Sequence, residues 1–237
     1  SALACLLALG VGLELFRDER VAFAGAVLAA LYPPLVWHSV HLMTEPLFIF
    51  LTVAAIYAAL RSGRETGFGW AALAGFAFGL AALARSVILG FVPLAGAWLW
   101  WVRGRKVRAA GASLLLWVMA AAAMTPWWVR NYERFGRFVP STTDGGHGFY
   151  VANNPYALHD PRGFWMPGDP DPRPGHPENP EPRSFAFLKK PGETVLNDEV
   201  EIGRRLVARA LEFWIENPGA TLRLTARRFG SFWRPWP

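Results

Sequence analysis

The strongest constraint on this chain is a series of long apolar runs within its first 128 residues. The six runs that are nearly free of charged side chains are Ala2–Leu13, Val21–Trp37, Pro46–Leu60, Phe68–Ala84, Val87–Val102 and Ala109–Trp128. The complete runs have roughly 15 to 20 residues, close to the length of a helix that crosses a bilayer core. Glycine and alanine fill them, as suits close helix packing in lipid. The pattern predicts an all-α polytopic membrane protein with about six transmembrane helices, the first of them truncated.

Changes in composition divide the chain into three predicted segments. Residues 1–128 form a transmembrane helical domain, residues 129–196 an outer-face loop, and residues 197–237 amphipathic helices that lead to the next membrane span. Ten of the nineteen prolines fall between Pro155 and Pro191. Because proline continues neither a helix nor an inner strand, this stretch is predicted to be extended and exposed. The chain begins without Met, inside an apolar run, so we expect an internal fragment.

Two amphipathic helices are predicted after the proline-rich stretch. Asn197-Asp198-Glu199 supplies a cap and first-turn acids, and Asn217-Pro218-Gly219 ends the first helix. Val200, Gly203, Val207, Leu211 and Trp214 recur on one face of this predicted amphipathic helix. A second helix, from Thr221, carries apolar side chains opposite several arginines, which is typical of a helix that lies on or enters a membrane.

Loop charges predict the orientation of the chain in the membrane. Basic residues cluster in the connections at residues 17–20, 61–64 and 103–108, whereas residues 37–44 contain no Lys or Arg. The basic loops are therefore expected in the cytoplasm and residues 129 onward on the outer face of the membrane. Since the arginines behind the net charge of +6 sit beside membrane spans, we expect membrane lipid rather than nucleic acid as a partner.

Polar side chains at the predicted outer ends of the helices are the candidate functional residues. Glu45 and His41 are the catalytic candidates, because a carboxylate with a histidine one turn away can bind a metal or a hydroxyl, or assist proton transfer. The alternative is that Thr44-Glu45-Pro46 only caps a helix. Arg85 lies at a helix turn, where it can hold a phosphate by two parallel contacts or simply reach the lipid headgroups.

Four further residues are candidates for substrate binding. Arg130 and Asn131 offer charge and amide donors at the predicted membrane surface, and the alternative is an interfacial anchor. Asn153 and Asn154 also belong to the set, although their Asn-Asn-Pro sequence first predicts a turn. No cofactor is certain, and a divalent cation at Glu45 is the one metal hypothesis.

Several motifs, taken in order along the chain, resemble one enzyme family. They are Tyr32-Pro-Pro34, Leu42-Met-Thr-Glu-Pro-Leu-Phe48, Gly79-Leu-Ala-Ala-Leu-Ala-Arg85, Pro126-Trp-Trp-Val-Arg-Asn-Tyr132, Phe135-Gly-Arg-Phe-Val139 and Asn153-Asn-Pro-Tyr156. This set resembles the bacterial C-type (GT-C) membrane glycosyltransferases, and among them the protein mannosyltransferase and aminoarabinose transferase-like branch.

The resemblance implies a membrane enzyme that transfers a sugar from a polyprenyl-phosphate carrier to a lipid, glycan or protein acceptor at the outer face. It further implies that Glu45 organises the site or a metal, and that Arg85 and Arg130 neutralise the carrier phosphate. The family's principal base lies in an earlier external loop, so the fragment alone is expected to be inactive. Two other classes stay open. One is a transporter or flippase for a lipid-linked or anionic substrate, whose polar groups would lie near broken helices at mid-membrane, and the other is a non-catalytic scaffold.

Overall fold

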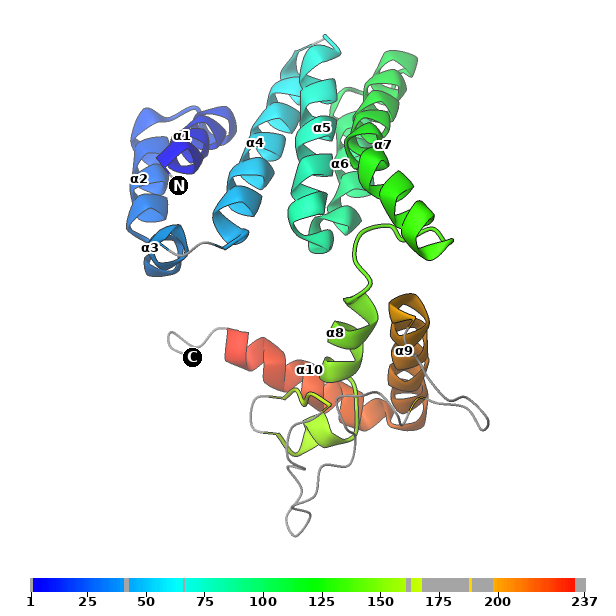
Figure 1. Cartoon of the computed structure of the whole chain (residues 1–237). Coiled ribbons are helices and arrows are strands. Elements are labelled where there is room, and N and C mark those ends of the chain that lie inside the picture. The colour runs from blue at the N-terminus through cyan, green and yellow to red at the C-terminus, as the bar shows by residue number, and fades with distance from the viewer. Residues whose placement is uncertain are drawn as a thin grey trace. The chain divides into compact units, whose positions relative to one another are not determined.

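The computed structural model describes residues 2–40, 43–65, 67–160, 163–167, 188 and 198–232, and every regular element among them is a helix. The chain divides into two compact units, unit 1 of residues 1–141 and unit 2 of residues 142–237. Figure 1 shows the helices of both units coloured by residue number. The all-α class predicted from the apolar runs is confirmed.

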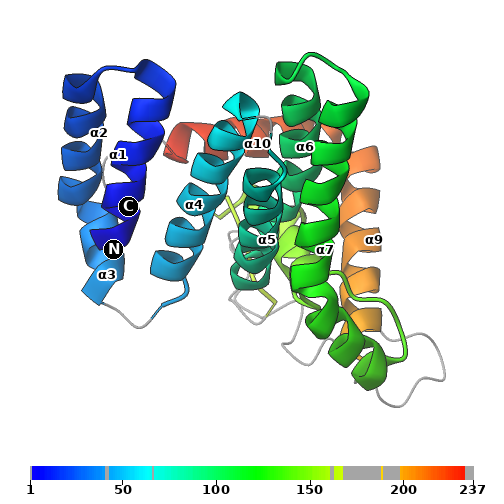
Figure 2. The ribbon, with the colours of Figure 1, turned by 90° about the horizontal axis from the view of Figure 1, so that it is seen from above.

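Unit 1 is a layer of helices packed side by side, seen from two directions in Figures 1 and 2. Its elements are α1 (Ala2–Phe16), α2 (Glu19–Leu31), α3 (Pro33–Val40), α4 (Glu45–Arg64), α5 (Gly69–Ala84), the 3-10 helix η1 (Ser86–Gly90), α6 (Phe91–Val102) and α7 (Val107–Phe135). α1 packs on α2 and α4, α5 lies between α4 and α7, and α6 packs on α7.

Length and composition support fewer membrane spans than the six expected. The 20 residues of α4 and the 29 of α7 are long and apolar enough to cross a membrane, and α2 with α3 makes a third span if its two bent halves are counted as one. α1, α5 and η1 with α6 are apolar but shorter. The 16 residues of α5 reach only about 24 Å, against a hydrocarbon core of about 30 Å. Membrane character therefore rests on two or three candidate spans.

The apolar run Val21–Trp37 is broken in the middle and does not form one straight helix. α2 and α3 meet at an angle of 56°. Tyr32, the residue between them, has an extended backbone with ψ 114°. Two prolines follow it, and proline both pushes the preceding residue out of the helical region and lacks the N–H that a helix needs. The bend is thus a local consequence of Tyr32-Pro33-Pro34.

Small residues bring the backbones of α5 and α7 into contact. A Cβ atom built on Gly75 would lie 2.1 Å from the carbonyl oxygen of Leu116, and one on Gly79 would lie 2.5 Å from that of Ala120. Only glycine permits such an approach. Because Gly75 meets Leu116 and Gly79 meets Ala120, the two helices run in the same direction. The end of α5 at Arg85 therefore comes level with α7 near Pro126.

Unit 2 has its own small core. Its described elements are α8 (Gly145–Ala152), the 3-10 helix η2 (Tyr156–Leu158), α9 (Glu199–Glu216) and α10 (Pro218–Phe232). The fully buried Trp165 packs with Phe213 of α9 and Leu224 of α10. The predicted outer-face loop segment 129–196 begins with the last two turns of α7 and includes α8 and η2. Most of the proline-rich stretch from Pro155 to Pro191, predicted to be extended, lies outside the described residues.

α9 begins and ends where the sequence predicted, but a different face is buried. Asp198 caps it by accepting hydrogen bonds from two first-turn N–H groups, and Asn217 ends it. The buried residues are Gly203, Leu206, Ala210 and Phe213. Leu211 and Trp214, which belong to the face predicted from the sequence pattern, are exposed. The reason is the contact with α8, where a Cβ on Gly146 would lie 2.2 Å from the carbonyl oxygen of Gly203, so this close approach decides which face docks.

Two arginines of α10 contact other parts of unit 2. Arg227 donates hydrogen bonds to the carbonyl oxygens of Leu158 and Asp160, and Arg228 donates to that of Gly163. Its apolar residues Leu222 and Phe229, in contrast, are 71% and 67% exposed. These contacts leave an apolar surface on α10, which is the property expected of a helix on a membrane.

An acid and two arginines on α9 provide a test of pH dependence. Glu201 accepts hydrogen bonds from Arg204 and Arg205, and these bonds hold its pKa at about 2, below its ordinary value of 4.5. Their stabilisation is complete above the ordinary pKa and is lost as the pH falls toward 2. We expect the hydrogen-exchange protection of α9 amides to decline between about pH 5 and about pH 2.

The variant Glu201→Gln should lack this decline, because it has no carboxylate to protonate. Glu212→Gln, a change at an exposed acid on the same helix, should keep the wild-type profile. An unchanged pH profile in Glu201→Gln would contradict the assignment.

Candidate functional site

Glu45 and Arg85 are in contact although they are 40 positions apart in the sequence. A terminal nitrogen of Arg85 donates to Oε1 of Glu45. Glu45 opens α4 and Arg85 is the extended C-cap of α5, so the antiparallel packing of α4 and α5 brings these two ends together. The Glu45 side chain is 20% exposed and that of Arg85 is 48% exposed. Within the described part of the chain Arg85 donates to no other group, which leaves its further N–H groups for a ligand.

The capping explanation of Glu45 accounts for only part of this geometry. Pro46 occupies the first turn, as predicted for a helix start. Thr44, however, has a helical backbone and forms no side-chain capping hydrogen bond. The carboxylate of Glu45 meets a guanidinium from another helix. Glu45 therefore does more than begin α4.

An almost wholly apolar groove lies next to this ion pair. Its volume is about 540 Å³. It is lined by Phe48, Thr52, Ile56, Ala59, Leu60, Phe78, Val87, Ile88, Phe91, Leu94, Ala95 and Trp98. Glu45, Phe48, Thr52 and Ile56 are spaced by three or four residues, so they share one face of α4. Val87 and Ile88 follow Arg85 by two and three positions, so one end of the groove lies close to the charged pair.

One polar atom lies within the groove lining. Oγ1 of Thr52 is buried and has no hydrogen-bond partner among the described residues. A buried hydroxyl without a partner is costly, so it favours a ligand or water that supplies one. The groove thus offers an apolar surface with the hydroxyl of Thr52, next to the carboxylate of Glu45 and the guanidinium of Arg85.

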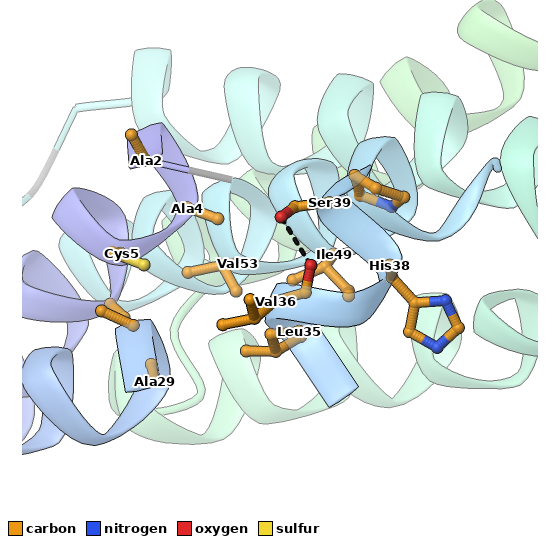
Figure 3. A pocket seen from close by; sticks show the side chains of 13 residues that line it. Ala2, Ala4, Cys5, Ala29, Leu35, Val36, His38, Ser39, Ile49 and Val53 are labelled. Carbon is orange, nitrogen blue, oxygen red and sulfur yellow. Dashed lines mark hydrogen bonds between the residues drawn. The ribbon is translucent and has the colours of Figure 1, made fainter. Parts of the chain in front are cut away.

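A smaller cavity of about 270 Å³ lies between α1, α2, α3 and α4. Figure 3 shows its lining, which includes Cys5, Val36, His38 and Ile49. Ser39 donates a hydrogen bond of 2.7 Å to the carbonyl oxygen of Val36, drawn as a dashed line. Nδ1 of His38 is buried without a partner in the described residues. The cavity is apolar except for these two polar side chains.

Arg130 and Asn131 lie on the last turns of α7, at the same end of unit 1 as Arg85. The Arg130 guanidinium stacks on Trp127, 4.7 Å from the ring centroid, and donates to Oδ1 of Asn131 at 3.2 Å. Asn131 is buried, and its Nδ2 donates to the carbonyl oxygen of Val139 at 3.4 Å. Asn131 therefore fixes the Arg130 side chain and the segment that follows α7. Of the two residues, only Arg130 offers a charge to a ligand.

Asn153 and Asn154 are part of the framework of unit 2. Nδ2 of the fully buried Asn154 donates to the carbonyl oxygen of Trp165, and its Oδ1 accepts from the N–H of Ala157. Oδ1 of Asn153 accepts from the indole N–H of Trp214 at 2.9 Å. These hydrogen bonds agree with the predicted turn and already engage both amides. We therefore leave both residues out of the candidate site, and their substrate-binding role stays a prediction.

His41 lies outside the described residues, so its place beside Glu45 stays a prediction. Among the residues that the structure describes, no three His, Cys, Asp or Glu side chains come together as a metal site. Divalent cations such as Mg²⁺ and Ca²⁺ take several oxygen ligands, whereas the Glu45 carboxylate faces a guanidinium. The described residues alone do not fit a divalent cation at Glu45, which also stays a prediction.

Comparisons of the chain with protein-family models, with curated proteins and with solved structures found no match. Glu45 and Arg85 could be named from the sequence, but the groove could not, because its lining consists of ordinary apolar residues. The only sequence signal for it was the helical spacing from Glu45 to Phe48, Thr52 and Ile56.

Proposed function

We propose that the chain belongs to an integral membrane glycosyltransferase. It would take a sugar from a polyprenyl-phosphate carrier at the outer face of a bacterial cytoplasmic membrane and transfer it to a lipid, glycan or protein acceptor. The six-span arrangement, with residues 129 onward on the outer face, is part of this proposal. The observation that carries it is the Glu45–Arg85 pair beside an apolar groove.

A polyprenyl-phosphate sugar has an apolar part and a charged part, and the site likewise combines an apolar groove with a charged pair. The carrier's long hydrocarbon chain suits the groove of about 540 Å³, which is lined almost entirely by apolar side chains. Its phosphate suits Arg85, whose planar guanidinium can donate two parallel hydrogen bonds to an anion. Arg130, at the same end of unit 1, is the second cation of the proposed site.

The chemistry requires two kinds of group. The acceptor oxygen attacks the anomeric carbon, the bond from that carbon to the phosphate oxygen breaks, and the polyprenyl phosphate leaves with the electron pair. Arg85 would stabilise the negative charge that develops on this leaving group. Glu45 would hold the guanidinium in place, and the proton of the acceptor hydroxyl would pass to a carboxylate base, which the resemblance implies lies in an earlier external loop. Glu45 is therefore proposed as an organising carboxylate.

A flippase for a lipid-linked substrate is the second candidate, and the bend between α2 and α3 favours it. Broken helices line the substrate paths of many transporters. In the described residues, however, the break at Tyr32 is flanked by apolar side chains and prolines, and the ion pair lies at a helix end. This arrangement supports the transferase more than the flippase.

The direct test uses the full-length protein in liposomes that contain a polyprenyl-phosphate hexose with a radiolabelled sugar. A transferase is expected to release free polyprenyl phosphate over time when acceptor is present. Movement of intact carrier between leaflets without release would establish the flippase. A protein that does neither would contradict both proposals.

The groove can be tested separately by filling it. Val87, which is 66% exposed and lines the groove, can be replaced by tryptophan. Because the indole would occupy space proposed for the hydrocarbon chain, we expect the KM for the carrier to rise about tenfold, equivalent to about 1.4 kcal/mol of binding. Leu73→Trp, at a 51% exposed position outside the groove, is the matched control and should leave KM unchanged. Equal KM values in both variants would remove the groove from the proposal.

A further inference from the structure

A second charged site lies at the opposite end of unit 1 from Glu45 and Arg85. It is a pocket of about 330 Å³ between the end of α4, the turn from α6 to α7 and the first turn of α7. Its charged lining residues are Arg64, Glu65, Arg103, Lys106 and Arg108. Four cations and one carboxylate therefore face one small space.

Carboxylates neutralise only part of this charge. Arg64 pairs with Glu14 of α1 at 3.1 Å, and Glu65 pairs with Arg61 at 2.6 Å. In the part of the chain that the structure describes, no acidic side chain pairs with Arg103, Lys106 or Arg108. Three positive charges without a counter-charge repel one another, and an anion between them would relieve the repulsion.

Arg103 is fixed at the pocket by neutral groups. Its guanidinium donates to the carbonyl oxygens of Ser62 at 2.6 Å, Glu65 at 2.6 Å and Gly67 at 2.9 Å. These oxygens orient the side chain but leave its formal charge uncompensated. Burial, and after it the like charge of Arg108, lowers the pKa of Arg103 below its ordinary value. The Arg103 side chain is therefore held in place at the pocket, where burial and the nearby charge of Arg108 disfavour its positive charge.

Residues typical of a membrane–water interface surround the pocket. The ring of Trp98 lies beside Gly63, 3.1 Å from where a Cβ would stand, and tryptophan is typical of membrane–water interfaces. Val107, between Lys106 and Arg108, is 91% exposed and presents an apolar side chain next to the charges. Phe68 lies under the Arg108 guanidinium at 5.8 Å. Cationic and apolar contacts are thus available side by side.

We infer that this pocket binds the phosphate group of an anionic phospholipid. The cationic side chains of Lys106 and Arg108 would donate to the phosphate oxygens, and the fixed guanidinium of Arg103 would add charge. Basic pockets between membrane helices recognise lipid headgroups in this way. The adjacent exposed Val107 favours a lipid over free phosphate. The inference does not depend on the proposed enzyme activity.

The test uses the full-length protein in nanodiscs of phosphatidylcholine with a small fraction of phosphatidylglycerol, and measures by native mass spectrometry which lipid stays bound. Wild-type protein should retain phosphatidylglycerol selectively. Lys106→Gln and Arg108→Gln should each weaken retention about fivefold, as expected for one cation at a membrane surface. Both side chains are exposed, so the thermal midpoint should not change.

Arg105→Gln is the matched control, since Arg105 carries the same charge in the same turn but does not line the pocket. It should retain the lipid like wild type. An equal loss in Arg105→Gln would show a diffuse surface effect and overturn the inference. Displacement of the lipid by millimolar inorganic phosphate would show a site for free phosphate and would also overturn it.

Discussion

Replacement of Arg85 by alanine in the full-length protein should lower the rate of sugar transfer from a polyprenyl-phosphate carrier by about 10²- to 10³-fold, the size of effect seen when a charge-stabilising donor is removed from an active site. The cause would be the loss of the cation that stabilises the leaving phosphate. Arg85→Lys should recover part of the rate, because lysine keeps the charge but not the two parallel hydrogen bonds. The measurement is kcat for release of polyprenyl phosphate from reconstituted protein.

Glu45→Gln keeps the shape of the side chain and removes its charge. We expect it to lower the rate of sugar transfer strongly, but less than Arg85→Ala does. If Glu45 acts chiefly through Arg85, the double variant Glu45→Gln with Arg85→Ala should be no slower than Arg85→Ala alone. A further loss in the double variant would instead indicate that Glu45 acts directly on the acceptor. The two outcomes separate a positioning role from a catalytic one.

Arg20→Ala is the control for Arg85→Ala, because Arg20 is an exposed arginine at the start of α2. It should transfer sugar at the wild-type rate. Each variant must also reach the membrane in folded form, which size-exclusion chromatography in detergent can establish. Near-normal turnover in both Arg85→Ala and Glu45→Gln would remove this ion pair from the proposed site.

The largest expected effect on stability is that of Gly75→Leu. The Cβ alone would stand 2.1 Å from a backbone oxygen of α7, and a backbone cannot move aside as a flexible side chain can. The helices must separate, so we expect a loss of roughly 1–3 kcal/mol or more, which is the usual cost of overpacking. The thermal midpoint of the detergent-solubilised protein is the measurement.

Gly69→Leu is the matched change in the same helix, since a Cβ on Gly69 meets nothing within 4 Å. It should unfold close to the wild-type temperature. If Gly75→Leu and Gly69→Leu have the same thermal midpoint, the close contact between α5 and α7 does not hold unit 1 together. A lower midpoint for Gly75→Leu alone supports that contact.

Helix ends were predictable wherever a local signal marks them. Asp198 and Asn217 bound α9 as expected, since capping groups act within a few residues. The bend at Tyr32 also has a local signal in the prolines that follow, although the length of the run Val21–Trp37 predicts a single span. Fewer helices than the six expected are long enough to cross a membrane, because composition marks apolar segments well, whereas helical lengths such as 15 residues in α1 and 12 in α6 emerge only in the fold.

Local sequence patterns were enough to predict a helical chain with apolar segments of membrane character and charged residues at their ends. They did not predict that Glu45 meets Arg85, that a groove lies beside them, or which face of α9 is buried. Periodicity and capping are local, but contacts between residues 40 positions apart depend on how whole helices dock, and close approaches at Gly75, Gly79 and Gly146 decide that docking.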